Sequence, residues 1–508
     1  MNAVLRSLSL ASWLLFRLPL AFSLSFVALT LYWIFSGFEV AKELLHWRLL
    51  GVAVGTLEAF PNIIAQPLIQ KLYPFLEAAS IVVIFFLGLL LAYNAAALLN
   101  WGLVRVRWKP IRYSTGAPYI FDPVRPLDPE FANVDRIGIV LAGGGAKGAF
   151  QAGAMKAVYR YLDEKNALSK VKVIAGTSIG SWNALFWLAD LVKPDNGWQG
   201  ESVHERWWQS ISAKSLTAPS WYVPFLRNAF LSTEPWQQVF THIFSKKPEV
   251  ANRIATSGIH FYLTRSNVMS GTLECATNNP NPPPITDVAY DILNPGDLAQ
   301  FMEDLRTAVF SSMDLPPLFP YIRRNGKVFE DGGVIDNVPL IFAAMDACDL
   351  IFVLPLNSDF EEELNETSVF ARLFRVMDVR QGVLERNGFK MAYLYNELAA
   401  LRQDAQGLRK QHGLPQTLPL TDNTPLATAL RRTNRHANVF TVCQLRSFVN
   451  SSIGTQEFWK RKEASKVFRV MYDATWGLLP NFHFDQPEYR VRMALVSMGG
   501  NVTWDEEF

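Results

Sequence analysis

Hydrophobic residues concentrate in two long uncharged stretches near the start of the chain. Residues 18–37 and residues 78–104 contain no Asp, Glu, Lys or Arg. About 20 apolar residues are enough for a helix to cross the hydrocarbon core of a bilayer. We therefore expect residues 1–107 to form a membrane anchor with two transmembrane helices. Two alternatives remain open: helices buried in a large core, or a cleaved signal peptide for the first stretch, although no A-x-A-like cleavage site follows it.

Basic residues mark the end of the second predicted span. They are Arg105, Arg107, Lys109 and Arg112. The stretch between the spans carries three basic and four acidic residues and so has no such excess. Because basic residues collect on the cytoplasmic side of a membrane, we expect a multi-pass protein of the inner or cell membrane, with the part after residue 104 in the cytoplasm. Five prolines indicate an extended linker over residues 108–135.

Apolar runs and amphipathic stretches alternate from residue 136 onward. Short apolar runs at 137–142 and 171–175 predict buried strands. Helical patterns follow each of them, at 146–164 and 182–192. This strand–helix–strand–helix order predicts an α/β fold with a parallel sheet covered by helices.

The pattern continues less regularly toward the C-terminus. We expect one strand from 260 to about 275, a helix at 298–310, and strands near 327–329 and 350–354. Residues 193–259 form a long insertion whose tryptophans could either contact the bilayer interface or pack internally. The catalytic domain is thus expected at 136–357, followed by a mainly helical extension at 358–508.

Composition narrows the possible partners. The net charge is +2 and only 19% of the residues are charged, so we expect no nucleic acid partner. The three cysteines, Cys275, Cys348 and Cys443, are widely spaced and predict reduced, buried thiols. The histidines and cysteines lack metal-ligand spacing, so we expect neither a metal nor a cofactor.

Candidate chemistry begins at Gly176-Thr177-Ser178-Ile179-Gly180, which follows the second predicted strand. A G-x-S-x-G run between a strand and a helix is typical of a sharp turn that exposes a nucleophilic serine. The motif alone is weak, because a serine at this place could simply cap the helix. The strand–turn–helix context favours Ser178 as a nucleophile.

A glycine-rich loop, Gly143-Gly144-Gly145-Ala146-Lys147-Gly148, follows the first predicted strand. It fits G-x-G-x-x-G and could bind a dinucleotide. Alternatively, the backbone N–H groups of Gly144 and Gly145 could stabilise an oxyanion, with Lys147 adding positive charge. We favour the oxyanion hole, because Ser178 occupies the end of the second strand, where a dinucleotide site would need an acidic residue.

The candidate base is Asp331, in Asp331-Gly332-Gly333. Asp-Gly pairs are common in ordinary turns, but this one follows the glycine loop and the serine turn in order. A Ser–His–Asp triad remains an alternative. The histidines that would fit its chain order are His412, His436 and His483.

These motifs, together with Pro316-Pro317-Leu318-Phe319-Pro320, resemble the patatin-like phospholipase family over roughly residues 136–357. The resemblance implies a three-layer α/β/α domain with a mainly parallel sheet and a Ser–Asp dyad without histidine. It places Ser178 and Asp331 in the dyad and the oxyanion loop at Gly143, Gly144 and Gly145. Lys147 stands where the family more often has arginine. Trp182 stands where a small residue is usual and could narrow the acyl site.

The resemblance also implies an acyl-enzyme mechanism on lipid esters, with a membrane lipid as substrate. A dyad without imidazole requires direct contact between Asp331 and Ser178, so we expect Asp331 to be desolvated with a raised pKa. Two other functions remain open at this stage, a catalytically silent lipid-binding scaffold and a nucleotide-binding protein. The sequence does not specify the lipid, the acyl position or the oligomeric state.

Overall fold

The computed structural model describes residues 127–505, with gaps at 196, 199, 212–215, 220–228, 230, 317, 357–368, 414–439, 448–460, 482–490 and 497–501. The expected anchor, both expected spans and most of the linker lie outside these residues. Among the helices that are described, none combines the length and apolarity needed to cross a membrane. A small separate unit contains the hairpin of β3 (Ala218–Pro219) and β4 (Leu231–Ser232). All other elements described below belong to the larger unit.

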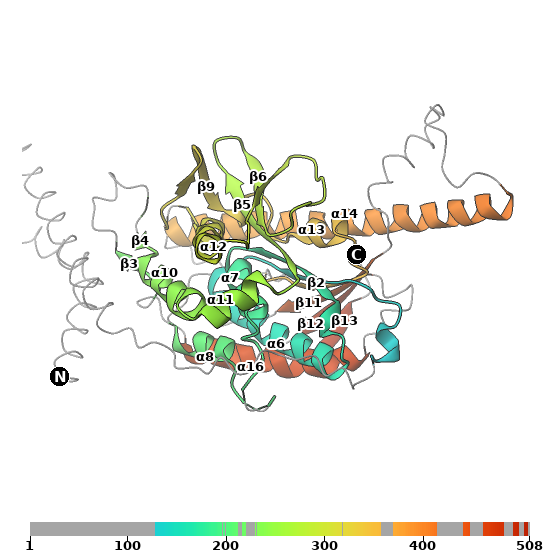
Figure 1. Ribbon diagram of the computed structural model, residues 1–508, viewed down its shortest axis with the longest axis horizontal. Helices are drawn as coiled ribbons and strands as arrows, with labels where there is room; N and C mark the ends of the chain where they lie inside the picture. Colours follow the sequence, from blue (N-terminus) through green and yellow to red (C-terminus); the bar gives the residue numbers. More distant parts are fainter. Residues whose placement is uncertain are drawn as a thin grey trace, which may run out of the picture. The chain divides into compact units, whose positions relative to one another are not determined.

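A mixed, mainly parallel sheet organises the larger unit (Figure 1). Its main path runs β13-β12-β11-β10-β1-β2-β5-β6-β7, and β9 pairs with both β5 and β8. The strands are β1 (Ile137–Leu141), β2 (Val171–Thr177), β5 (His260–Asn267), β6 (Thr272–Thr277), β7 (Val288–Ile292), β8 (Ile322–Arg324), β9 (Lys327–Asp331), β10 (Leu350–Leu354), β11 (Thr441–Ser447), β12 (Val491–Val496) and β13 (Val502–Asp505).

The central strand β1 explains where the site forms. All five of its residues are buried, as expected for an apolar strand covered on both faces. It runs parallel to β2 and β10, so the C-terminal ends of these strands meet at one edge of the sheet. At that edge β1 leads into the glycine loop and β2 leads into Ser178.

Helices cover both faces of the sheet. The main ones are α6 (Gly148–Glu164), α7 (Ile179–Leu188), α12 (Leu298–Met313), α13 (Leu340–Met345), α14 (Val369–Gln411) and α16 (Arg461–Leu478). Figure 1 shows α6 and α16 on one side of the sheet and α13 and α14 on the other. The core on the α13 side combines side chains of β1, β2 and β10 with Phe342 and Phe389. The α/β fold with a mainly parallel sheet is therefore confirmed.

The expected single strand from 260 to about 275 is wrong, because the chain folds back into the antiparallel hairpin β5–β6. Asn267 closes the turn, and its Oδ1 accepts hydrogen bonds from the N–H groups of Met269 (3.1 Å) and Ser270 (3.3 Å). Gly271 completes the turn with φ +70°, which glycine adopts without a steric penalty.

The expected domain boundary at residue 357 does not coincide with an edge of the sheet. β11 from the C-terminal region pairs in parallel with β10, and β12 and β13 extend the sheet further. α16 packs against α6, with the guanidinium of Arg160 3.8 Å from the centre of the Trp476 ring. The C-terminal region therefore adds strands as well as helices to the same fold. Short strands separated by long irregular stretches carry too weak a pattern for the sequence to reveal them.

The long insertion at 193–259 contributes helices that bury its tryptophans. They are α8 (Val203–Ser210), α10 (Glu234–Phe240), the π-helix Thr241–Ser245 and α11 (Pro248–Ala255). Trp207, Trp208 and Trp236 are almost completely buried, so these three pack internally instead of facing a bilayer. Trp182 lies among them, its ring centre 5.1 Å from Trp207 and 5.4 Å from Trp236. The three cysteines are buried free thiols, as the sequence predicted.

Candidate active site

Ser178 lies at a strained turn between β2 and α7. Its backbone has φ +54° and ψ −125°, a conformation that non-glycine residues rarely adopt. Gly180 is required nearby, because a Cβ at this position would lie 2.1 Å from the carbonyl oxygen of Leu141. Ser178 does occupy the N-cap position of α7, yet its side chain makes no capping hydrogen bond. Its hydroxyl is instead directed to another partner.

That partner is Asp331, at the end of β9. Ser178 Oγ donates a hydrogen bond of 2.6 Å to Asp331 Oδ2, and Asp331 Oδ1 accepts one of 2.7 Å from Gly333 N. The two side chains thus touch directly, with no imidazole between them. His412 is exposed just after α14, whereas the other two histidines considered for a triad lie outside the described residues.

Burial sets the basicity of Asp331. Its side chain is almost inaccessible to water, and this desolvation raises its pKa to about 6. The hydrogen bonds from Ser178 and Gly333 oppose the rise, and the nearby charge of Glu330 adds to it. The carboxylate is therefore largely ionised at neutral pH and is a stronger base than a solvated aspartate.

A second buried carboxyl group, Asp314, adjoins the dyad and was missed by the sequence reading. Its carbonyl oxygen accepts a hydrogen bond of 3.0 Å from Asp331 N. Neither carboxyl oxygen of Asp314 has a hydrogen-bond partner among the described residues. Burial raises the pKa of Asp314 well above its usual range, and Asp331 and Glu330 raise it further. The neutral form is therefore favoured, which leaves Asp331 as the charged member of the two.

The glycine loop passes directly beside Ser178. A Cβ added to Gly143 would lie 3.0 Å from Ser178 Cβ. Gly143 N donates a hydrogen bond of 3.1 Å to Asn337 O, so this N–H group is already occupied. In the described residues no acceptor is found for the N–H groups of Gly144 and Gly145. Gly144 is the N-cap and Gly145 the first residue of a short 3-10 helix, where the first N–H donors stay unpaired. Two of the three expected oxyanion glycines thus offer a donor.

Gly145, Lys147 and Asn337 also determine the shape of the loop. Gly145 has φ +56°, a left-handed conformation that suits glycine. Lys147 is buried, and its backbone N–H donates to Gly144 O at 3.1 Å. Asn337 Nδ2 donates to Gly143 O at 3.2 Å, which ties the loop to the segment that follows Asp331.

Two buried serines, Ser181 and Ser312, form hydrogen bonds that hold the turn at Ser178 in place. Ser312 Oγ, near the end of α12, accepts a hydrogen bond of 2.8 Å from Ser178 N. It also lies 2.9 Å from Ser181 Oγ, which donates to Gly176 O at 2.9 Å. Both serines are fully buried. Sequence reasoning missed them, since a serine inside a helix carries no signal of a distant partner.

The glycine loop is held at both ends by a group of buried, uncharged side chains. We call this group the neutral clamp, and it consists of Gln151, Asn183, His204 and Trp208. Gln151 Nε2 donates to the carbonyl oxygens of Ala142 (3.1 Å) and Leu354 (2.9 Å). Asn183 Nδ2 donates to Gly148 O (3.1 Å) and to Gln151 Oε1 (2.9 Å). Both ends of the loop are therefore fixed by buried amide side chains.

His204 and Trp208 complete the neutral clamp from α8. His204 Nε2 lies 2.9 Å from Asn183 Oδ1, and Trp208 Nε1 donates to the same oxygen at 3.1 Å. Burial lowers the pKa of His204 to about 3, so its ring is neutral at physiological pH. An amide side chain such as Asn183 in a mostly apolar helix is the signal by which the sequence could have revealed this clamp.

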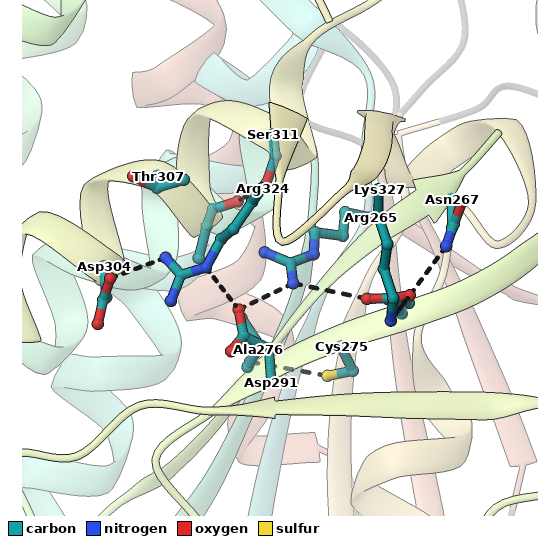
Figure 2. A network of polar contacts seen from close by, with 12 residues as sticks. Arg265, Asn267, Cys275, Ala276, Asp291, Asp304, Thr307, Ser311, Arg324 and Lys327 are labelled. Atoms are coloured by element: carbon teal, nitrogen blue, oxygen red, sulfur yellow. Dashed lines mark hydrogen bonds and ion pairs between the residues drawn. The ribbon is translucent and has the colours of Figure 1, made fainter. Parts of the chain in front are cut away.

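The strand that carries Asp331 is held by what we term the charged anchor, formed by Arg265, Glu274, Asp291, Asp304, Arg324 and Lys327. Figure 2 labels five of these residues, Arg265 from β5, Asp291 from β7, Asp304 from α12, Arg324 from β8 and Lys327 from β9. The sixth, Glu274, belongs to β6. Arg265 is the cross-strand neighbour of Asp331 and is only 2% exposed.

The charges of the anchor balance one another. Arg265 Nη2 lies 2.8 Å from Asp291 Oδ2 and 3.6 Å from Glu274 Oε2. Arg324 bridges Asp291 (3.3 Å) and Asp304 (2.8 Å), as Figure 2 shows. Lys327 pairs with Glu274 at 2.6 Å. Three cations thus face three carboxylates, so this cluster fixes β9 without leaving a net charge beside the dyad.

Comparison with known proteins identifies the class of this domain. Residues 139–344 match the family model described as "Patatin-like phospholipase". This part of the chain is therefore a patatin-like phospholipase domain, a class of acyl ester hydrolase.

Two individual proteins are similar to parts of the chain. The curated "Lysophospholipase NTE1" of Kluyveromyces lactis is 24% identical over 255 residues, which cover 47% of this chain but only 14% of that protein. The crystal structure of VipD from Legionella pneumophila shares 13% identity and a TM-score of 0.29, over 68% of this chain and 67% of that one.

Proposed function

We propose that this protein is a serine acyl hydrolase that cleaves fatty-acyl esters of phospholipids or related lipids. The hydrogen bond of 2.6 Å between Ser178 Oγ and Asp331 Oδ2 carries the proposal, because it pairs a nucleophile on a strained, partly buried turn with a desolvated base. The family match and the relative named as a lysophospholipase support the choice of lipid esters.

The acylation step follows from this geometry. Ser178 Oγ attacks the ester carbonyl carbon while its proton passes to Asp331, and the carbonyl electron pair moves onto oxygen. The N–H groups of Gly144 and Gly145 stabilise this oxyanion, and the buried Lys147 adds positive charge to the loop. The tetrahedral intermediate then collapses, the bond to the alcohol oxygen breaks, and Asp331 returns its proton to the leaving alcohol.

Deacylation repeats the same proton transfers with water. Asp331 takes a proton from the attacking water, whose oxygen forms the new bond to the acyl carbon. When the second tetrahedral intermediate collapses, the bond to Ser178 Oγ breaks and Asp331 reprotonates the serine. The products are the free fatty acid, the lipid alcohol and unchanged enzyme.

Membrane anchoring is the second part of the proposal. The uncharged stretches at 18–37 and 78–104 would hold the catalytic domain on the cytoplasmic face of the inner or cell membrane, next to a substrate dissolved in the same bilayer. Full-length protein should remain in the membrane fraction after an alkaline carbonate wash. Its complete release by that wash would contradict the two spans.

Labelling with a fluorophosphonate probe tests the chemistry. We expect wild type to label and Ser178→Ala and Asp331→Asn not to label, because both variants lack an activated Ser178. Fatty-acid release from phospholipid, lysophospholipid and acylglycerol substrates then identifies the lipid. Labelling that survives in Ser178→Ala would place the reactive residue elsewhere. A wild type that neither labels nor releases fatty acid would instead favour a silent lipid-binding protein.

A further inference from the structure

Among the side chains of the long helix α14 that the structure describes, those that are buried lie on one face of the helix. Phe389, Ala392 and Ala399 are at most 5% exposed. Asn396 is also buried on this face, and its Oδ1 accepts a hydrogen bond of 2.8 Å from Phe440 N. Spacings of three and four residues place these side chains along one line of the helix, so this face is already occupied.

Large apolar side chains line the nearly opposite face of the same helix and are exposed. They are Met391 (46%), Leu394 (51%), Leu398 (42%), Leu401 (62%) and Leu408 (58%). At about 100° per residue, this line lies roughly half a turn away from Ala392 and Ala399. We call it the leucine stripe. A contiguous exposed apolar line of this kind marks an interaction surface.

The leucine stripe has the spacing of a coiled-coil seam. Together with Ala405, its members alternate steps of three and four residues, which assigns Met391, Leu398 and Ala405 to heptad position a. Leu394, Leu401 and Leu408 then occupy position d. Such an a/d line is narrower than the face that a helix buries in a globular core or in a bilayer. The seam therefore fits another helix best.

Charges beside the stripe indicate which helix would fit. Asp404 occupies position g and Arg409 the following position e. In a parallel pair of identical helices, position g of one helix faces the following position e of the other, so acid meets base. An antiparallel pair would bring acid against acid and base against base. The sequence repeats this spacing one heptad earlier, with glutamate at position 397 and Arg402 five residues later.

We propose that the leucine stripe of α14 binds the same stripe of a second copy of this chain, as a short parallel coiled coil. Cysteine cross-linking of the full-length protein tests the arrangement. Leu401→Cys places a thiol at position d, which faces its own copy in a parallel seam. Gln403→Cys, an exposed position outside the seam, is the matched control. The native cysteines Cys275, Cys348 and Cys443 are buried and should not interfere.

We expect Leu401→Cys to form a disulfide-linked dimer under mild oxidation, whereas Gln403→Cys, which keeps the stripe, forms no disulfide cross-link between the two chains. Mass photometry of wild type should show a species of twice 57.3 kDa, which Leu398→Glu abolishes without lowering the unfolding temperature. Asp404→Arg should weaken the dimer roughly tenfold, and adding Arg409→Asp should restore it.

Three results would overturn the proposal. Equal cross-linking of both cysteine variants would exclude a specific parallel seam. A monomeric wild type in which Leu398→Glu lowers the unfolding temperature would show that the chain covers its own stripe. A monomeric wild type in which Leu398→Glu loses binding to phospholipid vesicles would assign the stripe to a membrane surface. None of these measurements depends on the catalytic activity.

Discussion

The two sides of the candidate site are held in place by different chemistry. The glycine loop is fixed by the neutral clamp, in which Gln151 and Asn183 hold backbone carbonyls and His204 is uncharged. The strand that carries Asp331 is fixed by the charged anchor around Arg265. A negative charge close to the loop would oppose the developing oxyanion, and the uncharged side chains of the neutral clamp add none. A strand that only has to hold a position can use ion pairs, provided that their charges cancel.

The largest effect is expected in the charged anchor. Arg265→Met would leave the buried carboxylate of Glu274 and the partly buried carboxylate of Asp291 with fewer cationic partners, and such a loss costs about 3–5 kcal/mol of the free energy of unfolding. Urea denaturation at pH 7 measures it. Arg324→Met, at a side chain that is 19% exposed, is the control and should cost less. Equal costs for the two variants would show that burial of Arg265 is not what matters.

Removing the charge of Asp331 should stabilise the fold while abolishing activity. Its pKa is raised to about 6 from an ordinary 3.8, so the folded state holds the proton more tightly. The stability from this group is therefore present below about pH 4 and lost as the pH rises through about 6. Asp331→Asn, which retains hydrogen-bonding capacity toward Ser178 and Gly333, should raise the unfolding free energy at pH 8 by roughly 2–3 kcal/mol. Thermal unfolding at pH 4 and pH 8 tests this, because the gain should shrink at the lower pH.

In the neutral clamp, Asn183→Leu should reduce kcat while leaving KM nearly unchanged. The variant frees Gly148 O and Gln151 Oε1, so the loop loses part of its fixed geometry, and small misplacements of catalytic groups cost roughly 10- to 100-fold in rate. Steady-state kinetics measures the effect, with the lipid ester that the fatty-acid release assay selects as substrate. Asn252→Leu, at an exposed position on α11, should behave as wild type. A change confined to KM would assign Asn183 to substrate binding.

The smallest effect is expected at the second carboxyl group of the dyad region. Wild-type kcat/KM should rise with pH through about 6 as Asp331 loses its proton. Because burial raises the pKa of Asp314 and favours its neutral form, Asp314→Asn should leave this pH dependence of kcat/KM unchanged. If kcat/KM of the variant instead rises at a lower pH than that of the wild type, Asp314 is charged in the wild type and helps to raise the pKa of Asp331.

Local sequence patterns were sufficient for most of the fold near the site. The strand at 137–142, the glycine loop and the strand before Ser178 were predicted close to their observed bounds. The helix after Ser178 was also predicted, but it begins three residues earlier and ends four residues earlier than expected. These elements can be predicted because each depends on consecutive residues. The patterns are an apolar run for a strand, a cluster of glycines for the loop, and a change to helical spacing of the apolar residues for a helix. The direct contact of Ser178 with Asp331 and the raised pKa of Asp331 were also expected, and the geometry agrees with both.

Contacts between distant segments were decided only by the tertiary structure. The hairpin at Asn267, the strands β11–β13, the buried Asp314 and the neutral clamp all depend on residues far apart in the chain. Gly143 illustrates the difference. From the motif, the N–H group of Gly143 was expected to face an oxyanion. In the folded chain this N–H group donates a hydrogen bond to Asn337 O at 3.1 Å. The sequence by itself determined which residues could do chemistry here. The tertiary structure decided which of them keep a free donor or a desolvated charge, because hydrogen bonding and burial belong to the packed chain and not to the motif.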